Sequence, residues 1–262
     1  SSAASDVYKR QNNANTPLSN SVNFVKSVTS TYSYKTSLTD TDILNIVTTA
    51  LGAGAVPLDA NGIYFVLTAP EVTASSGFCT QYCGWHTYST YSGTNIKYSF
   101  VGNPATQCPS GCGVKSPSPN GNGGADAMAS VIVHELEEAH SDPELNAWYD
   151  SQGYENADKC AWTFGTTMTT STGATYNLII GGSPFLIQQN WMNSGSTGYC
   201  SLTGPPLAPV PAPVPAPVAK PSKPSKPSQP SQPTKPSKPS PTQPTAPKTA
   251  LFELSLLTDN YG

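Results

Sequence analysis

A histidine and two glutamates stand at metal-ligand spacing in the segment VIVHELEEAHSDPELNAW, residues 131–148. His134 and Glu138 are four residues apart, which places them one turn apart on the same face of a helix. Imidazole and carboxylate groups both bind divalent cations. Glu135 lies about 100° further round the helix, where zinc proteases keep the general base that activates water. The segment therefore predicts a cation site with His134 and Glu138 as ligands and Glu135 as the catalytic base.

The segment departs from the H-E-x-x-H motif of zinc proteases, because position 138 holds glutamate. His140 lies about 240° round the helix from His134, so it cannot replace the missing histidine. Zinc is the first choice for such a motif, but a more anionic ligand set also suits the harder ions Mn²⁺ and Ca²⁺. We therefore predict a divalent cation, with zinc first and Mn²⁺ or Ca²⁺ as alternatives.

Further ligands are expected outside this helix. Glu155 and Asp158 follow at one-turn spacing in YENADKC, and His86 directly follows the cysteine in CGW. We predict these three residues as the remaining metal ligands. Two simpler interpretations stay open. The eight acidic residues between positions 135 and 158 can form a solvated helix face, and His86 can bond a loop carbonyl.

The hydrophobic pattern predicts the elements that would position these residues. Apolar residues at helical spacing, after a capping Thr39 or Asp40, predict an amphipathic helix within residues 38–54. Apolar and aromatic runs predict strands at residues 62–70 and 96–102, and two more strands flank the glycine pair at 181 and 182 as a hairpin. The metal-binding helix should run from about residue 125 to 141. A mixed sheet packed by at least two helices gives an α+β fold class.

Six cysteines, an even number, predict three disulfides and an oxidising compartment. They are Cys79, Cys83, Cys108, Cys112, Cys160 and Cys200. Cys160 and Cys200 flank the last globular stretch and are the most natural pair. The first four show paired x3 spacings that also fit a four-thiolate zinc site, and their connectivity stays open. The low content of charged residues, 11%, favours a secreted protein.

Composition divides the chain unevenly. Seventeen of the 26 prolines lie within residues 205–248, which also contain six lysines and no acidic or aromatic residue. Such a segment cannot bury enough apolar surface to offset the entropy of ordering, which predicts a disordered, polyproline-like stalk over residues 204–250. Residues 251–262 are the tail end, and the chain should tolerate truncation at Gly204. The globular domain is then residues 12–203.

The first residues are interpreted as foreign to the protein. DVYKRQ, residues 6–11, is what the end of a common transposon-type sequencing adapter encodes, so residues 1–11 are expected to be a library remnant that replaces the true N-terminus. Residues 1–203 carry 14 acidic and seven basic side chains, a net charge of −7, which excludes a nucleic-acid-binding surface. No apolar run is long enough to span a bilayer.

Six ordered stretches resemble the phosphate-induced, EXORDIUM-like family of plants and some microbes. They are GIYFVLTAPEV, GFCTQYCGWH, VGNPATQCPSGC, GADAMASVIVHELEEAHSDPELNAWY, ENADKCAWTFG and the final GYC. The resemblance runs from about Ser37 to Cys200 and includes all six cysteine positions. It implies a secreted cell-wall or apoplastic protein linked to growth and nutrient response, with no established catalytic activity. Family members begin with a further strand and helix. The family's H-E-L-A-E and E-x-x-D-x-C patterns match His134, Glu135, Glu138, Glu155, Asp158 and Cys160.

Two functions from different classes fit these observations. The first is a secreted, zincin-like and disulfide-stapled metallohydrolase that cuts peptide bonds in extracellular protein. The second is a non-enzymatic cell-wall or apoplast module for binding or growth signalling, in which the acidic cluster is structural. In both cases we expect a monomer whose partner is an extracellular protein or a cell-wall polymer.

Overall fold

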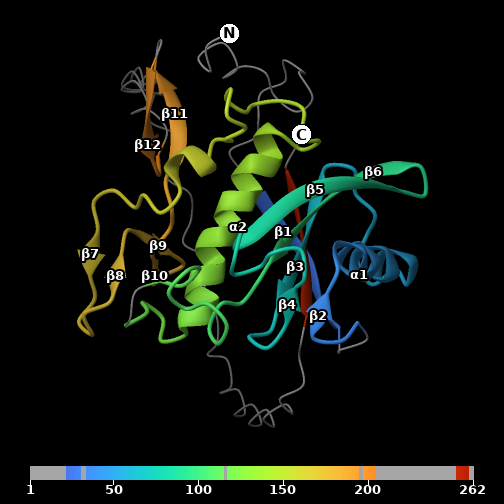
Figure 1. Ribbon diagram of the computed structural model, residues 1–262, viewed down its shortest axis with the longest axis horizontal. Coiled ribbons are helices and arrows are strands. Elements are labelled where there is room, and N and C mark those ends of the chain that lie inside the picture. The colour runs from blue at the N-terminus through green and yellow to red at the C-terminus, as the bar shows by residue number, and fades with distance from the viewer. Residues whose placement is uncertain (1–21, 31–33, 115–116, 195–196, 204–251, 260–262) are drawn as a thin grey trace, which may run out of the picture. The chain divides into compact units, whose positions relative to one another are not determined.

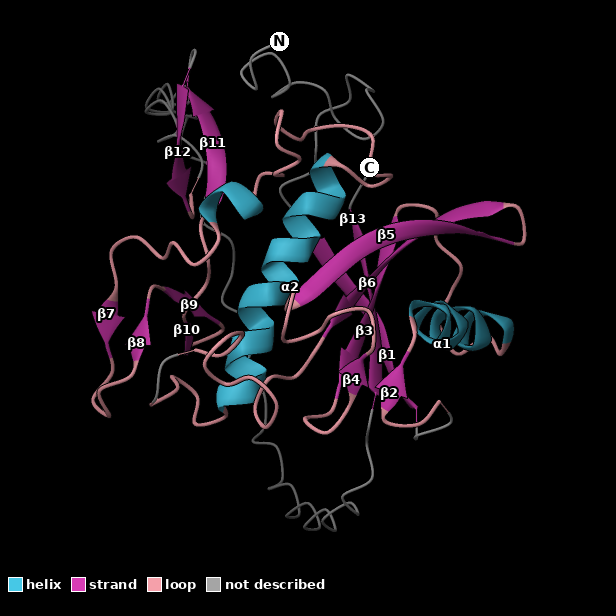
Figure 2. Ribbon diagram, in the orientation of Figure 1, coloured by secondary structure: helices cyan, strands magenta, loops and turns pink. Residues whose placement is uncertain are grey.

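The computed structural model describes residues 22–30, 34–114, 117–194, 197–203 and 252–259 of the 262-residue chain (Figure 1). The interpreted adapter remnant, residues 1–11, and the predicted stalk, residues 204–250, lie outside this part. Both assignments therefore stay predictions. The described residues combine strands with two α-helices, and the α+β class predicted from the sequence is confirmed (Figure 2).

A five-stranded sheet forms the centre of the fold. Its strands, in spatial order, are β1 (Val22–Ser30), β13 (Phe252–Asp259), β3 (Gly62–Thr68), β6 (Thr94–Val101) and β5 (Gly84–Tyr91). Only β3 and β6 run parallel, and the other neighbours are antiparallel. The strands predicted at residues 62–70 and 96–102 are confirmed as β3 and β6. The strand β5 was not predicted; it joins β6 through Ser92 and Gly93, which both have positive φ, as a tight two-residue hairpin turn requires.

The strand β13 corrects the expectation that the chain after Gly204 makes no part of the core. It pairs with β1 from Val22↔Asp259 to Ser30↔Phe252, and with β3 on its other side. The sequence FELSLLTD alternates apolar and polar residues over its first four positions, as a strand does. The expectation is wrong because this short segment follows the proline-rich stretch, and its own alternation is too brief to predict a strand that pairs so far along the chain. Truncation at Gly204 removes an inner strand of the sheet.

Both faces of the sheet are covered, which explains why β3 is apolar almost throughout. The helix α1 (Asp40–Gly52) buries Ile43, Ile46, Val47 and Leu51 on the face that presents Tyr64 and Val66. On the other face, Ile63 and Phe65 pack against the helix α2 (Gly123–Ser141) through Met128 and Val131. Figure 1 shows α1 and α2 on either side of the sheet.

The two predicted helices are confirmed, and their ends follow local chemistry. Thr39 Oγ1 accepts a hydrogen bond from the Asp42 backbone N, and the Thr39 backbone N donates one to Asp42 Oδ2, so α1 begins with a capping box. The side chain of Asn122 caps α2 by accepting from the Ala125 backbone N. The helix α2 ends at Ser141, before Asp142 and Pro143, as predicted.

Short elements and disulfides complete the described fold. The short elements are β2 (Ser37–Leu38), β4 (Thr73–Ala74), the 3₁₀ helix η2 (Asp158–Cys160), β7 (Met168–Thr169), β8 (Thr175–Tyr176), β9 (Leu178–Ile180), β10 (Ser183–Phe185), β11 (Asn190–Ser194) and β12 (Thr197–Ser201). β9 and β10 form the hairpin predicted around Gly181 and Gly182. None of the described helices is long and apolar enough to cross a membrane.

The structure settles the cysteine connectivity that the sequence left open. The bonds are Cys79–Cys108, Cys83–Cys112 and Cys160–Cys200. The third pair is the one that the sequence favoured. The four-thiolate zinc alternative is wrong, because all four candidate sulfurs are consumed in disulfides.

Candidate metal centre

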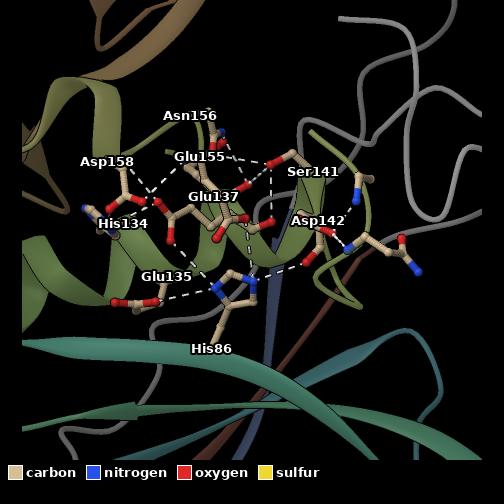
Figure 3. A network of polar contacts seen from close by, with 12 residues as sticks. His86, His134, Glu135, Glu137, Ser141, Asp142, Glu155, Asn156 and Asp158 are labelled. Atoms are coloured by element: carbon tan, nitrogen blue, oxygen red, sulfur yellow. Dashed lines mark hydrogen bonds and ion pairs between the residues drawn. The ribbon is translucent and has the colours of Figure 1, made fainter. Parts of the chain in front are cut away.

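The candidate site lies where α2 faces the strand β5 and the turn η2. The helix contributes His134, Glu135 and Glu138, β5 contributes His86, and η2 contributes Asp158 (Figure 3). Glu135 and Glu138 are each only 4% exposed and His86 is 7% exposed. The solvated-face interpretation is therefore wrong for these two glutamates. Burying carboxylates is costly unless they are paired, so their partners define the site.

His134, Glu138 and Asp158 form the first group, which we call the outer cluster. His134 Nε2 lies 3.1 Å from Glu138 Oε1 and 3.4 Å from Asp158 Oδ1. The Asp158 backbone N also donates to Glu138 Oε1, at 3.1 Å. One ligand atom from each of the three residues lies within 4.8 Å of the other two. The structure thus brings together three of the residues that the sequence proposed as metal ligands.

His86, Glu135 and Glu138 form a second group, the inner cluster. His86 Nδ1 lies 3.5 Å from Glu135 Oε2 and 3.6 Å from Glu138 Oε2. His86 Nε2 lies 3.1 Å from the Asp142 backbone carbonyl, and a carbonyl only accepts, so Nε2 carries the hydrogen. This bond fixes the ring and turns Nδ1 toward the two carboxylates, an arrangement common among metal-binding histidines. The carbonyl bond and the ligand position, weighed as alternatives from the sequence, therefore occur together.

The charges of the histidines and the carboxylates in the two clusters stabilise each other. Burial disfavours the protonated form of His86, but the carboxylates of Glu135 and Glu138 outweigh it and raise the pKa of His86 to about 11. Burial also opposes the protonated form of His134, whereas Asp158 and Glu138 raise its pKa to about 11. Burial opposes ionisation of Glu138, but the two histidines lower its pKa to about 2. Each protonated histidine therefore supplies the positive charge that a bound metal ion would otherwise supply to the carboxylates.

Glu155 does not take the metal-ligand position predicted for it. Its Oε1 is 3.8 Å from His86 Nε2 and has no hydrogen-bond partner, although it is buried. Burial, followed by the charge of Glu138, raises the pKa of Glu155 to about 8. Glu155 and Asp158 lie in one turn, closed by the bond from the Lys159 backbone N to the Glu155 carbonyl, but the Glu155 carboxylate lies beside His86 and the Asp158 carboxylate beside His134. Within the described chain, Glu155 belongs to neither candidate ligand group.

A pocket of about 200 Å³ opens onto the outer cluster. Its lining includes His134, Glu135 and Asp158, and the other lining residues are Gln81, Tyr82, Cys83, Gly84, Val131, Ala161, Trp162 and Gln188. Gly84 is required here, because a Cβ atom would lie 2.8 Å from Glu135 Oε1. A larger cavity, about 950 Å³, lies at the N-terminal end of α2, but none of the described residues that line it has a titratable side chain.

Sequence reasoning missed two residues at the rim of this pocket. Trp162 is 46% exposed and has φ of 59°, which is unusual for a bulky residue. Its backbone N donates to Oε1 of the buried Gln188, at 2.8 Å. No spacing rule links these residues to the HELEE segment, so the sequence offered no signal for them. His140, which was expected to point away, lines a different small pocket with Lys97 and Pro143.

Comparison with known proteins identifies related chains. A family model described as "Phosphate-induced protein 1 conserved region" matches residues 3–202. The matched range starts inside the segment interpreted as adapter-encoded, and that interpretation stays a prediction. No solved structure matches the chain significantly.

Among curated proteins, "Protein EXORDIUM-like 3" of Arabidopsis thaliana is 36% identical over 204 residues, covering 66% of this chain and 59% of the relative. "Protein EXORDIUM-like 5" of the same plant is 34% identical over 193 residues, covering 62% of this chain and 53% of the relative. The chain therefore spans between about half and three fifths of the length of these relatives.

Proposed function

The chain belongs to the phosphate-induced protein 1 family, and we propose that it is a secreted member that binds one divalent cation in the outer cluster. The disulfides and the EXORDIUM-like relatives are consistent with a secreted protein. The ligands of this proposal are His134, Glu138 and Asp158, with zinc as the first choice and Mn²⁺ or Ca²⁺ as alternatives. The cell wall or apoplast is the proposed location.

One observation carries the cation proposal: three donor atoms from two elements converge beside an open pocket. His134 Nε2 is 3.1 Å and 3.4 Å from its two carboxylate neighbours. Ligand atoms held about 2.1 Å from one ion in tetrahedral geometry lie about 3.4 Å from each other. The three donors therefore need little movement to share an ion. His134 and Asp158 also line the pocket, which gives a small molecule access to the same side.

Hydrolysis is the finer part of the proposal. Glu135 lines the same pocket as His134 and is not part of the outer cluster. Burial raises the pKa of Glu135, which favours a carboxylate that can take up a proton during a reaction. A cation in the outer cluster would supply Lewis acidity. We propose a zincin-like hydrolase that cuts peptide bonds in extracellular protein, with Glu135 as the general base.

A second candidate function rests on a different observation. The raised pKa values of His86 and His134 keep both rings protonated at neutral pH, so the network can balance its own charge. In that case the clusters are structural and the protein is a non-enzymatic cell-wall or apoplast module for binding or growth signalling. The two candidates differ in one measurable respect, because cation binding must displace a proton from His134.

Metal content of the secreted protein tests the cation proposal. We expect about one equivalent of a divalent metal by mass spectrometry in the parent and in the His140→Ala control, and loss of the metal in His134→Ala. Zinc titration into chelated parent should release protons, measured by calorimetry in buffers of different ionisation enthalpy. A parent that binds no metal at added micromolar zinc overturns the cation proposal and leaves the structural network.

A separate variant tests the finer proposal of hydrolysis. Glu135→Gln should keep the metal, because Glu135 is not an outer-cluster ligand, and should lose cleavage of a mixed extracellular protein substrate. Parent protein with bound metal and no cleavage above that of Glu135→Gln contradicts hydrolysis but leaves the cation site intact.

A further inference from the structure

The strand β13 fills an inner position of the main sheet. Each residue from Phe252 to Thr258, apart from local irregularity near Lys26 of β1, faces β1 on one side and β3 on the other. Backbone groups on both edges of β13 are therefore used in pairing. Among the described strands, β1 pairs only with β13. The position between β1 and β3, which we call the strand slot, thus decides whether β1 belongs to the sheet.

The connection that leads to β13 is much longer than the turn between β5 and β6. β5 and β6 are joined by the two residues Ser92 and Gly93, whereas 50 residues, Leu202–Leu251, separate β12 from β13. A two-residue turn dictates which strands pair, but a connection of this length does not. The effective concentration of a segment on such a linker is about millimolar or below, and it falls further as the linker grows. A strand from another molecule therefore competes only as the protein concentration approaches that value.

The connection is long enough to reach a neighbouring molecule. It contains 17 prolines, which lack the backbone N–H that a sheet strand needs. A fully extended chain spans at most about 3.3–3.6 Å per residue, so 50 residues can bridge at most about 165–180 Å, several times the width of a small domain.

From this placement we propose that the strand slot is an acceptor site for an extended peptide and that β13 of a second copy of this chain fills it. Recognition is by backbone pairing on both edges, so the contacts made by a second copy's strand are the same as those made within one chain. The result is self-association by strand exchange, which keeps every backbone bond and adds no new interface. This inference does not depend on the cation site.

The register allows a direct test by cross-linking. Ser27 of β1 and Ser255 of β13 are Cα partners, and opposed residues of antiparallel strands lie about 4.5–5.5 Å apart, within disulfide reach. Two full-length proteins, Ser27→Cys and Ser255→Cys, are mixed and equilibrated in a glutathione buffer. A disulfide between positions 27 and 255 can then form only between two molecules. It is quantified on non-reducing gels and located by peptide mass spectrometry.

The matched control pairs Ser255→Cys with Asn23→Cys, because Asn23 lies opposite Thr258 and is out of register. We expect the Ser27→Cys and Ser255→Cys mixture to give a heterodimer whose fraction rises about in proportion to protein concentration below the effective concentration. The control pair should stay at background.

Two results overturn the proposal. The first is a heterodimer yield no higher than that of the control at every concentration, while the doubly substituted chain, Ser27→Cys with Ser255→Cys, cross-links within itself. That outcome means that β13 fills only its own slot. The second is a doubly substituted chain that does not cross-link at all, which means that β13 does not occupy the strand slot.

Discussion

Side chains hold the candidate metal centre together, whereas backbone hydrogen bonds hold the strand slot together. In the metal centre, side chains of His86, His134, Glu135, Glu138 and Asp158 meet, and each depends on the charge of the others. In the strand slot, backbone groups of β1, β13 and β3 pair in register along the strands. A single substitution should therefore disturb the first region, whereas the second should respond to loss or interruption of the chain.

The largest expected effect comes from removing β13 from the strand slot. Truncation after Gly204 removes β13 and leaves two strand edges unpaired. With about 1 kcal/mol per net backbone bond lost, we expect the free energy of unfolding to fall by more than about 5 kcal/mol, and thus the melting temperature to fall by more than about 10 °C. The matched control deletes residues 214–240 and keeps β13. Equal melting temperatures for the truncated and parent proteins would contradict the role of β13.

The next effect belongs to the metal centre. His86→Ala removes the ring beside the buried carboxylates of Glu135 and Glu138, so that only His134 is left to balance their charge. Breaking a buried ion pair from one side costs about 3–5 kcal/mol, measured here by urea unfolding in chelator. His140→Ala, outside both clusters, should lower stability by less than His86→Ala does. If the two variants unfold alike, the inner cluster contributes no cohesion.

A backbone position within the metal centre should give an intermediate effect. In Gly84→Ala, the new Cβ would lie 2.6 Å from Val131 Cγ1 and 2.8 Å from Glu135 Oε1, so β5 and α2 must separate slightly. Overpacking of this kind costs about 1–3 kcal/mol. The matched control is Gly123→Ala, where the nearest atom is 4.0 Å away. Thermal melts that show the same shift for both alanines would mean that β5 and α2 are not tightly packed at Gly84.

Taken per pH unit, the smallest effect is a dependence of stability on pH. Glu155 has a folded-state pKa of about 8 against an ordinary value of 4.5. Between these values the native state keeps a proton that the unfolded state has lost, so stability falls as pH rises, by up to about 1.4 kcal/mol per pH unit. In chelator, Glu155→Gln should flatten this fall between pH 4.5 and 8. Parallel stability curves for parent and variant, from urea melts at each pH, would show that Glu155 ionises normally.

How far the sequence predicts these two regions depends on the distance between the residues involved. The shared face of His134 and Glu138 follows from helix geometry, and the apolar runs of β3 and β6 follow from burial on both faces. The strand β5 was missed because alternating tyrosine and hydroxyl residues in GWHTYSTY also fit a loop. The bond from His86 to the Asp142 carbonyl joins residues 56 positions apart through a backbone group. The pattern of side-chain types along the sequence does not predict a contact of this kind.

The split of the predicted ligands between two clusters has a similar cause. Glu155 and Asp158 share one turn, but their carboxylates lie beside different histidines, His86 and His134, and the spacing alone does not predict which. The strand β13 lies beyond a 50-residue connection, and no local signal says where a strand so far along the chain will pair. Pairing partners of this kind are set by tertiary structure, because sheet register depends on both neighbours.

The disulfides Cys79–Cys108 and Cys83–Cys112 have the same separation, 29 residues, and together they bracket the β5–β6 hairpin. Its turn, Ser92 and Gly93, is exposed. A protease that cuts this turn therefore leaves two fragments that stay covalently joined at both cystines, with His86 still attached beside α2. Such a nicked molecule should run as a single band on a gel until a reducing agent is added, and should keep its fold in a protease-rich extracellular medium. Separation of the fragments without reductant would show that the two cystines do not span the cut.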